Sequence, residues 1–363
     1  MPSPPLDIAP QRRVLITGGA GFVGACLAIA LRRRHPAWEI VALDNLKRRG
    51  SELNLARLRE EGIAFVHGDI RDGADLDAAG AVDVLVECSA EPSVLAGTDG
   101  LPEYVVRTNL LGAYHCLEHA RRHGAAFVFL STSRVYPVAA LESLAFEEAP
   151  LRYELSDAQT VPGASSAGIA EALPMSGPRS LYGATKLSAE LLIEEYRETY
   201  GIRAVVNRCG VIAGPWQFGK ADQGVFTYWM LAHVFDRPLR YIGYGGSGKQ
   251  VRDLLHIDDL VALIDEQVVN LERWDGMTVN VGGGRAGSLS LLETTALCRE
   301  LTGRHIEVES STEQRPGDVR IYLSDCALLH GHTSWRPERS PRDVLADIFN
   351  WINENQGAVR AAL

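Results

Sequence analysis

The sequence has little of what would place the chain in a membrane or on nucleic acid. Across 363 residues, no apolar run approaches the roughly 20 residues of a membrane-spanning helix. The formal net charge is -10, and the basic clusters are confined to 32–34 and 47–49. We therefore expect neither nucleic acid nor a membrane as a partner. The proline-rich start lacks the apolar core of a signal peptide, which predicts a disordered arm over residues 1–11.

Closely spaced cysteines are also missing. The six cysteines are scattered along the chain, and no two of them have the spacing of a zinc site or a disulfide framework. This pattern predicts that the protein binds no metal through cysteine and works in a reducing compartment. Together with the absence of a leader, it predicts a cytoplasmic protein.

What the sequence does contain is a series of short apolar segments that alternate with helical patterns. The expected strands are 13–17, 39–43, 63–66, 82–86, 126–130 and 203–208. Strands that alternate with helices predict an α/β protein with a Rossmann-type, doubly wound parallel sheet, whose ligands bind beyond the carboxyl ends of the strands. We assign 12–214 to this domain and 215–363 mainly to a smaller C-terminal α/β lobe, with chain crossings between the two.

A glycine-rich turn follows the first expected strand. Gly18, Gly21 and Gly24 have the spacing G-x-x-G-x-x-G between that strand and a helical segment. This order suits a tight turn, a close backbone approach to a pyrophosphate and close packing of the helix on the strand. Asp44 ends the second strand, where an acid accepts hydrogen bonds from ribose hydroxyls and repels the 2′-phosphate of NADP. The expected cofactor is therefore NAD.

Tyr182 and Lys186 lie four residues apart at the start of a segment with helical periodicity. Residues i and i+4 share a helix face, so both side chains can point at one spot. A cation near a phenol lowers the pKa of its hydroxyl from about 10, which predicts that Tyr182 can act as a base near neutral pH. This spacing also occurs by chance. It indicates a catalytic pair only where other polar residues lie at the same edge of the sheet. The polar residues that directly follow expected strands are Asp44, Asp69, Ser89 and Thr132.

Together these motifs resemble those of the extended short-chain dehydrogenases/reductases of the nucleotide-sugar epimerase and dehydratase type. The matching strings are GGAGFVG, HGDIRD, STSRVY, YGATK and RDLLHIDD, in family order over almost the whole chain. Within this family, several stretches are similar to the CDP-tyvelose (CDP-paratose) 2-epimerases. These stretches are LDNLKRRGSELNLARL, AGPWQFGKADQG, GYGGSGKQVRDLLHIDD and NVGGGRAGSLSLLE.

The resemblance implies an epimerase that oxidises a nucleotide-linked sugar transiently with bound NAD and returns the hydride to the opposite face. Tyr182 would take the proton of a sugar hydroxyl, Lys186 would lower the pKa of Tyr182 and hold the nicotinamide ribose, and Thr132 would orient the sugar. The cofactor contacts implied by family position are Gly18, Gly21, Phe22, Val23, Gly24, Asp44, Asn45, Asp69, Ile70, Ser89, Ala90, Asn109, Tyr182, Lys186 and Cys209. The implied contacts to the nucleotide-diphosphate sugar are Glu91, Thr132, Gln217, Asp222, Gln223, Arg252, Arg315 and Asp318. Relatives pair through two helices, and the corresponding segments here are amphipathic, so we expect a homodimer.

The chain departs from the family pattern at three places. Ser133 and Arg134 stand where the 4,6-dehydratases carry Asp and Glu, which argues against dehydration. Residues 87–91 read ECSAE where relatives have a string of the apolar-apolar-His-x-Ala-Ala type, and this places Glu91 near the sugar. Val211 replaces an asparagine that contacts phosphate in relatives. Carbon 2 is the favoured position of epimerisation. A 4-epimerase remains an alternative, and so does a non-catalytic NAD-binding sensor, although a sensor would not need the Tyr–Lys pair.

Overall fold

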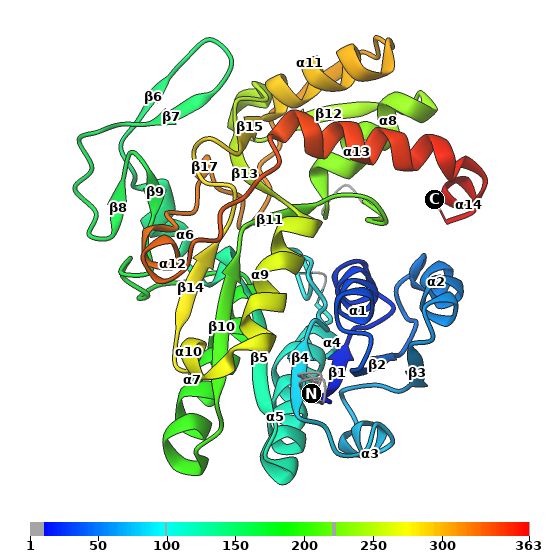
Figure 1. Ribbon diagram of the computed structural model, residues 1–363. Helices are drawn as coiled ribbons and strands as arrows, with labels where there is room; N and C mark the ends of the chain where they lie inside the picture. The colour runs from blue at the N-terminus through cyan, green and yellow to red at the C-terminus, as the bar shows by residue number, and fades with distance from the viewer. Residues whose placement is uncertain (1–10, 99, 220–222, 363) are drawn as a thin grey trace, which may run out of the picture.

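A seven-stranded sheet forms the centre of the computed structural model, which describes residues 11–98, 100–219 and 223–362 (Figure 1). Its strands are β1 (Arg13–Thr17), β2 (Glu39–Asp44), β3 (Ala64–His67), β4 (Val84–Glu87), β5 (Ala126–Thr132), β10 (Ala204–Cys209) and β14 (Thr278–Val281). Their order across the sheet is β14-β10-β5-β4-β1-β2-β3, and each neighbouring pair is parallel. The predicted Rossmann-type parallel sheet is thus confirmed. The expected arm over 1–11 lies, except for residue 11, outside the described residues.

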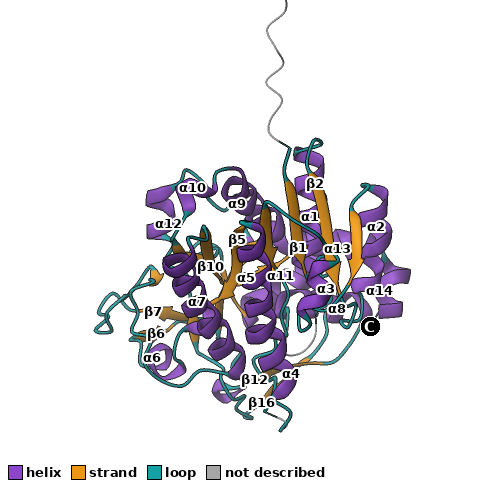
Figure 2. Ribbon diagram, turned by 90° about the horizontal axis from the view of Figure 1, so that it is seen from below, coloured by secondary structure: helices purple, strands orange, loops and turns teal. Residues whose placement is uncertain are grey.

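Helices cover both faces of this sheet (Figure 2). Along β1, Val14 and Ile16 belong to the core on one face, and Leu15 belongs to the core on the other. Because both faces are buried, the strands are almost continuously apolar, which is why they were recognisable in the sequence. The main covering helices are α1 (Phe22–Arg34) and α9 (Ile257–Val269) on the first face, and α5 (Gly112–His123) and α7 (Leu181–Tyr200) on the second.

The outermost strand, β14, comes from the C-terminal part of the chain. It pairs with β10 from Val206 opposite Thr278 to Cys209 opposite Val281. The helix α9 that precedes it packs on the sheet through Leu260 and Leu263, both fully buried. The chain therefore returns from the smaller lobe to the sheet over α9 and β14.

The smaller lobe lies beyond the carboxyl ends of the central strands (Figure 1). Its strands are β11 (Val211–Ala213), β13 (Val251–His256), β15 (Ser288–Ser290) and β17 (Ile321–Tyr322), with a separate pair of β12 (Leu239–Ile242) and β16 (Val308–Ser311). Its helices α8 (Val225–Phe235), α11 (Leu291–Thr302) and α13 (Pro341–Glu354) enclose a core that contains Met230, Leu345 and Ile348. Capping boxes start α11 at Ser290 and α13 at Ser340.

The long connection between β5 and α7 is folded onto the smaller lobe. Its elements are α6 (Val138–Glu142) and the hairpins of β6 (Phe146–Glu148) with β7 (Tyr153–Leu155) and β8 (Ala164–Ser165) with β9 (Gly168–Ile169). Leu155 and Ile169 share a core with Val251 and Ile321 of the lobe. The remaining elements are 51–53, α2 (Asn54–Glu60), α3 (Gly73–Asp77), α4 (Glu103–Val106), a π-helical turn at 107–111, 133–135, 244–246, α10 (Leu271–Trp274), α12 (Ala327–His332) and α14 (Gln356–Ala362). None of the helices in the described ranges is long and apolar enough to cross a bilayer.

We predict that Leu345→Ala lowers the free energy of unfolding by about 2–5 kcal/mol, because it leaves a cavity in the fully buried core of the smaller lobe. The measurement is a urea titration followed by tryptophan fluorescence. The matched control is Leu328→Ala on α12, where the leucine is 49% exposed and the expected change is within about 0.5 kcal/mol. Equal losses in the two variants would contradict this assignment of the core.

Candidate active site

A cavity of about 600 Å³ opens at the carboxyl edge of the parallel sheet, where ligands bind in this architecture. Its wall is built from the turns after β1 to β5, the first turns of α7 and the loop that follows β11. Most of the residues predicted from the sequence are brought together here. Those that line the cavity are Gly18, Gly21, Phe22, Val23, Gly24, Asp44, Asn45, Asp69, Ile70, Ser89, Ala90, Glu91, Thr132, Tyr182, Lys186, Gln217 and Gln223.

The glycine turn after β1 leaves room only for backbone. Gly18 has a φ of +63°, and a Cβ there would lie 2.9 Å from the backbone of Cys88. A Cβ on Gly24 would collide with the carbonyl oxygen of Gly18. Gly21 is the N-cap of α1, so the free N–H groups of the helix start face the cavity. This cradle fits the pyrophosphate of a dinucleotide.

Two acids follow the neighbouring strands. The Asp44 carboxylate accepts hydrogen bonds from the backbone N–H groups of Ala20 at 3.1 Å and Leu46 at 2.7 Å. Burial raises the pKa of Asp44, and these N–H groups oppose the rise. Burial also acts to raise the pKa of Asp69, but hydrogen bonds from Arg71 and Asn45 outweigh it and lower that pKa to about 2. Asp44 therefore ties the glycine turn to β2 and presents carboxylate oxygen where a ribose would lie.

Two of the residues predicted to contact the cofactor lie behind the wall of the cavity. Asn109, in the π-helical turn, accepts a hydrogen bond from the Glu91 N–H at 2.8 Å and donates one to the Glu91 carbonyl at 3.0 Å. It therefore positions the loop after β4. Cys209 is buried at the end of β10, and burial raises the pKa of its thiol to about 12, so it is not a thiolate at neutral pH.

The first turn of α7 is pressed against the end of β5. The Ser180 hydroxyl caps this helix by accepting a hydrogen bond from the Gly183 N–H at 3.1 Å. A Cβ on Gly183 would collide with the carbonyl oxygen of Arg134, so only glycine allows this approach. The approach brings Tyr182 into hydrogen-bonding contact with Thr132.

The pKa of Tyr182 differs from the sequence-based prediction. Burial raises it above its ordinary value, while Lys186, the hydrogen bond with Thr132 and the guanidinium of Arg134 lower it by less. The predicted effect of Lys186 is present, but the predicted net lowering of the Tyr182 pKa is wrong. The spacing of Tyr182 and Lys186 contains no information about how deeply the phenol is buried.

Lys186 is held by an acid that the sequence did not identify as a partner. Its Nζ lies 3.1 Å from Oε2 of Glu87 at the end of β4, and the two side chains are 2% and 1% exposed. Burial raises the pKa of Glu87, and Lys186 opposes the rise. The second oxygen of Glu87 has no hydrogen-bond partner among the described residues. The sequence feature that could have indicated this role is the position of Glu87 as the last residue of the otherwise apolar segment VLVE.

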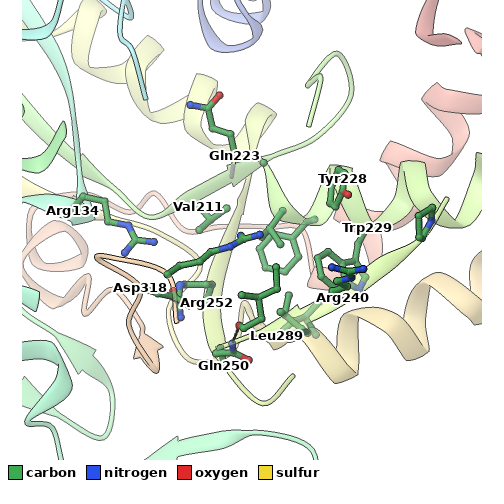
Figure 3. Close-up of a pocket in the computed structure, with 17 residues that line it drawn as sticks. Arg134, Val211, Gln223, Tyr228, Trp229, Arg240, Gln250, Arg252, Leu289 and Asp318 are labelled. Carbon is green, nitrogen blue, oxygen red and sulfur yellow. Dashed lines mark hydrogen bonds and ion pairs between the residues drawn. The ribbon is translucent and has the colours of Figure 1, made fainter. Parts of the chain in front are cut away.

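A second cavity of about 420 Å³ lies in the smaller lobe, and Arg134, Val211, Gln223 and Gly224 line both cavities (Figure 3). It combines basic and aromatic side chains. Those that line it include Arg240, Arg252, Arg315, Asp318, Phe226, Tyr228 and Trp229. Arg252 donates to Asp318 at 2.6 Å. This lining suits an anion attached to a flat ring.

Two further predicted residues, Gln217 and Gln223, line the first cavity near the loop after β11. The amide of Gln217 bonds to the Ile212 carbonyl at 2.9 Å and to the Thr227 hydroxyl at 2.6 Å, so it stabilises the loop after β11. Gln223 accepts a hydrogen bond from Arg48. Asp222 lies outside the described residues. No cluster of three or more His, Cys, Asp or Glu side chains that could hold a metal occurs in the described ranges.

Comparisons with known proteins agree with this geometry. Residues 14–282 match the NAD dependent epimerase/dehydratase family. The CDP-paratose 2-epimerase of Salmonella typhi is 29% identical over 94% of this chain and 99% of its own length. The dTDP-glucose 4,6-dehydratase of Streptomyces antibioticus is 31% identical over 94% of this chain and 93% of its own.

The fold has solved counterparts as well. The structure of the UDP-glucose 4-epimerase of Thermotoga maritima with UDP-glucose has a TM-score of 0.76 at 23% identity, and the match covers 95% of this chain and 99% of that one. The resemblance stated from the motifs is confirmed. The chain belongs to the NAD-dependent epimerase/dehydratase family, with NAD as its cofactor.

Proposed function

We propose that the protein is an epimerase of a nucleotide-diphosphate sugar that oxidises the sugar transiently at carbon 2. The observation that carries the proposal is the position of Tyr182, Thr132 and Lys186 in a cavity that adjoins the basic and aromatic second cavity. Residues 12–214 would bind NAD and 215–363 would mainly bind the nucleotide. Carbon 2 is favoured by the similarity to the CDP-paratose 2-epimerase over nearly the full length of both chains.

The roles of the side chains follow from their contacts. NAD, when bound, supplies reversible acceptance of a hydride from the sugar carbon. The Tyr182 phenolate takes the proton of the sugar hydroxyl, and Thr132, which hydrogen-bonds Tyr182, orients that hydroxyl. Lys186 favours the phenolate electrostatically, and Glu87 holds its ammonium in place. Net redox change is zero, so the cofactor stays bound between turnovers.

The turn after β5 supports epimerisation over dehydration. Elimination of water needs a general acid and a base beside the sugar, and this turn carries Ser133 and Arg134 after Thr132. Burial lowers the pKa of Arg134 only to about 10, so its guanidinium stays charged at neutral pH.

All six cysteines are free, which supports a reducing, cytoplasmic location.

The decisive measurement is incubation of the NAD-loaded protein with CDP-, UDP- and GDP-hexoses in deuterated water. We predict that one carbon of one sugar is inverted and that its hydrogen does not exchange, because the hydride leaves and returns within the site. NMR of the product identifies the inverted carbon, so inversion at carbon 4 would replace carbon 2 in the proposal.

The control is Tyr182→Phe, which removes one oxygen and should reduce turnover at least about a thousandfold while NAD stays bound. Near-full activity of this variant would contradict the assigned base. Deuterium at the inverted carbon would contradict transient oxidation there. If the wild type converts no sugar but binds NAD, the sensor alternative is favoured.

A second prediction concerns Glu87. Its carboxylate offsets the charge of Lys186, so Glu87→Gln leaves the ammonium unopposed and favours the Tyr182 phenolate. Activity falls at low pH as Tyr182 becomes protonated. A lower pKa of Tyr182 therefore moves the acidic limb of the kcat/KM profile to lower pH, by about one unit.

The matched control is Asp83→Asn, which removes an acid just before β4, where it accepts a hydrogen bond from the Arg13 backbone N–H at 2.7 Å. Its profile should coincide with that of the wild type. An unchanged or upward-shifted acidic limb in Glu87→Gln would show that Glu87 does not act on Tyr182 through Lys186.

We also infer that the chain forms a homodimer through the face made by α5 and α7. These neighbouring helices and the turn before α5 expose Leu111, Tyr114, Leu191 and Tyr200, each 40% exposed or more. Such a cluster is typical of helices that pair with a second copy.

We predict that Leu191→Glu converts the protein to a monomer, because it places a charge in the paired face. Sedimentation velocity should then give 39.5 kDa instead of twice that mass. Leu328→Glu on α12 changes a similarly exposed leucine away from this face and should leave the mass unchanged. A wild-type mass of 39.5 kDa, or a dimeric Leu191→Glu variant, would contradict the interface.

A further inference from the structure

Arg134 occupies the junction of the two cavities. It lies in the turn 133–135, two residues after Thr132, and lines both the cofactor cavity and the nucleotide cavity. Figure 3 shows its guanidinium pointing from the end of β5 toward the side of the second cavity where Arg252 and Asp318 lie. A ligand that extends from the second cavity to Tyr182 would therefore lie close to this side chain.

Among the described residues, Arg134 has no acidic partner for its charge. Its Nη1 donates to the Gly317 carbonyl at 2.9 Å, and no carboxylate of the described residues forms an ion pair with it. Asp318, an acid that acts electrostatically on Arg134, is paired with Arg252 at 2.6 Å. A guanidinium carries five N–H donors, and among the described residues the Gly317 carbonyl is the one acceptor that the Arg134 side chain bonds.

Removing such a cation from water without a counter-ion is unfavourable. Burial and the neighbouring charge of Arg252 both lower the pKa of Arg134, to about 10, which reflects this cost. The protein tolerates the cost at a position where the guanidinium also acts on the phenol of Tyr182. An anion bound by Arg134 would therefore lie beside the reacting carbon and would supply the missing partner.

Resting on the proposed function, we propose that Arg134 determines substrate specificity by binding an oxyanion of the nucleotide sugar beside the reacting carbon. The oxyanion is either the phosphate that is linked to the sugar or a carboxylate carried by the sugar ring. Both present two oxygens in the geometry that a guanidinium binds with paired hydrogen bonds.

Binding to the NAD-loaded protein separates the two sources without requiring turnover. The probes are CDP-glucose, UDP-glucose and UDP-glucuronic acid, measured by isothermal titration calorimetry on the wild type and on Arg134→Gln. If Arg134 binds the ring carboxylate, Arg134→Gln lowers the affinity for UDP-glucuronic acid at least about tenfold and the affinity for UDP-glucose less than twofold. If Arg134 binds the phosphate, the affinities for all three ligands fall by a similar factor of about ten or more.

Two controls separate a binding role from a structural one. Arg134→Lys keeps the charge without the paired hydrogen bonds and should recover part of the lost affinity. Arg342→Gln removes an exposed arginine of α13 that pairs with Glu300 at 2.8 Å and lines neither cavity, and it should leave the affinities unchanged. NAD affinity reports whether each variant is folded.

The proposal is overturned if Arg134→Gln changes all affinities less than twofold, or if the wild type binds none of the three ligands. Tight, Arg134-dependent binding without any epimerisation would leave the oxyanion site standing and would refute only the proposed reaction.

Discussion

The buried pair of Lys186 and Glu87 is the contact on which the candidate site depends. Neither charge could be buried alone, and breaking such a pair typically costs about 3–5 kcal/mol. Glu87 closes β4 in the middle of the sheet, and Lys186 lies one helical turn after Tyr182. The pair therefore places the start of α7, and with it the phenol, at the carboxyl edge of the strands where the glycine cradle opens.

A second buried pair holds the same helix from the other side. Glu190, one turn after Lys186, bonds to Arg208 of β10 at 2.7 Å and also accepts a hydrogen bond from Ser131 of β5. The strand β5 lies between β4 and β10, so the partners of Lys186 and Glu190 lie on opposite sides of β5. Sliding or rotating α7 would break both pairs together. The position of Tyr182 is thus determined by two ion pairs across three adjacent strands.

These contacts also show what the sequence could and could not reveal. The strands, the glycine turn and the Tyr182–Lys186 spacing are local patterns, and the structure contains them all. The partner of Lys186 lies 99 positions away and has no spacing signal. The strand β14 has four residues, one of them Asn280, whose buried side chain bonds to the Tyr136 hydroxyl and to the carbonyls of Ile169 and Asp325. Such features depend on tertiary contacts that periodicity does not encode.

The same dependence explains the pKa of Tyr182. A base beside the sugar needs the cation of Lys186, but that cation can be buried only with an anion next to it, and Glu87 opposes the phenolate. Burial of the phenol also opposes the phenolate, and it raises the pKa of Tyr182 above its ordinary value. A precise position of Lys186 requires an anion beside its ammonium group. A full effect of that ammonium on Tyr182 requires that no anion offsets its charge, so the two requirements oppose each other. The structure favours placement of Lys186 by Glu87, and Thr132 and Arg134 act together with Lys186 to favour the phenolate.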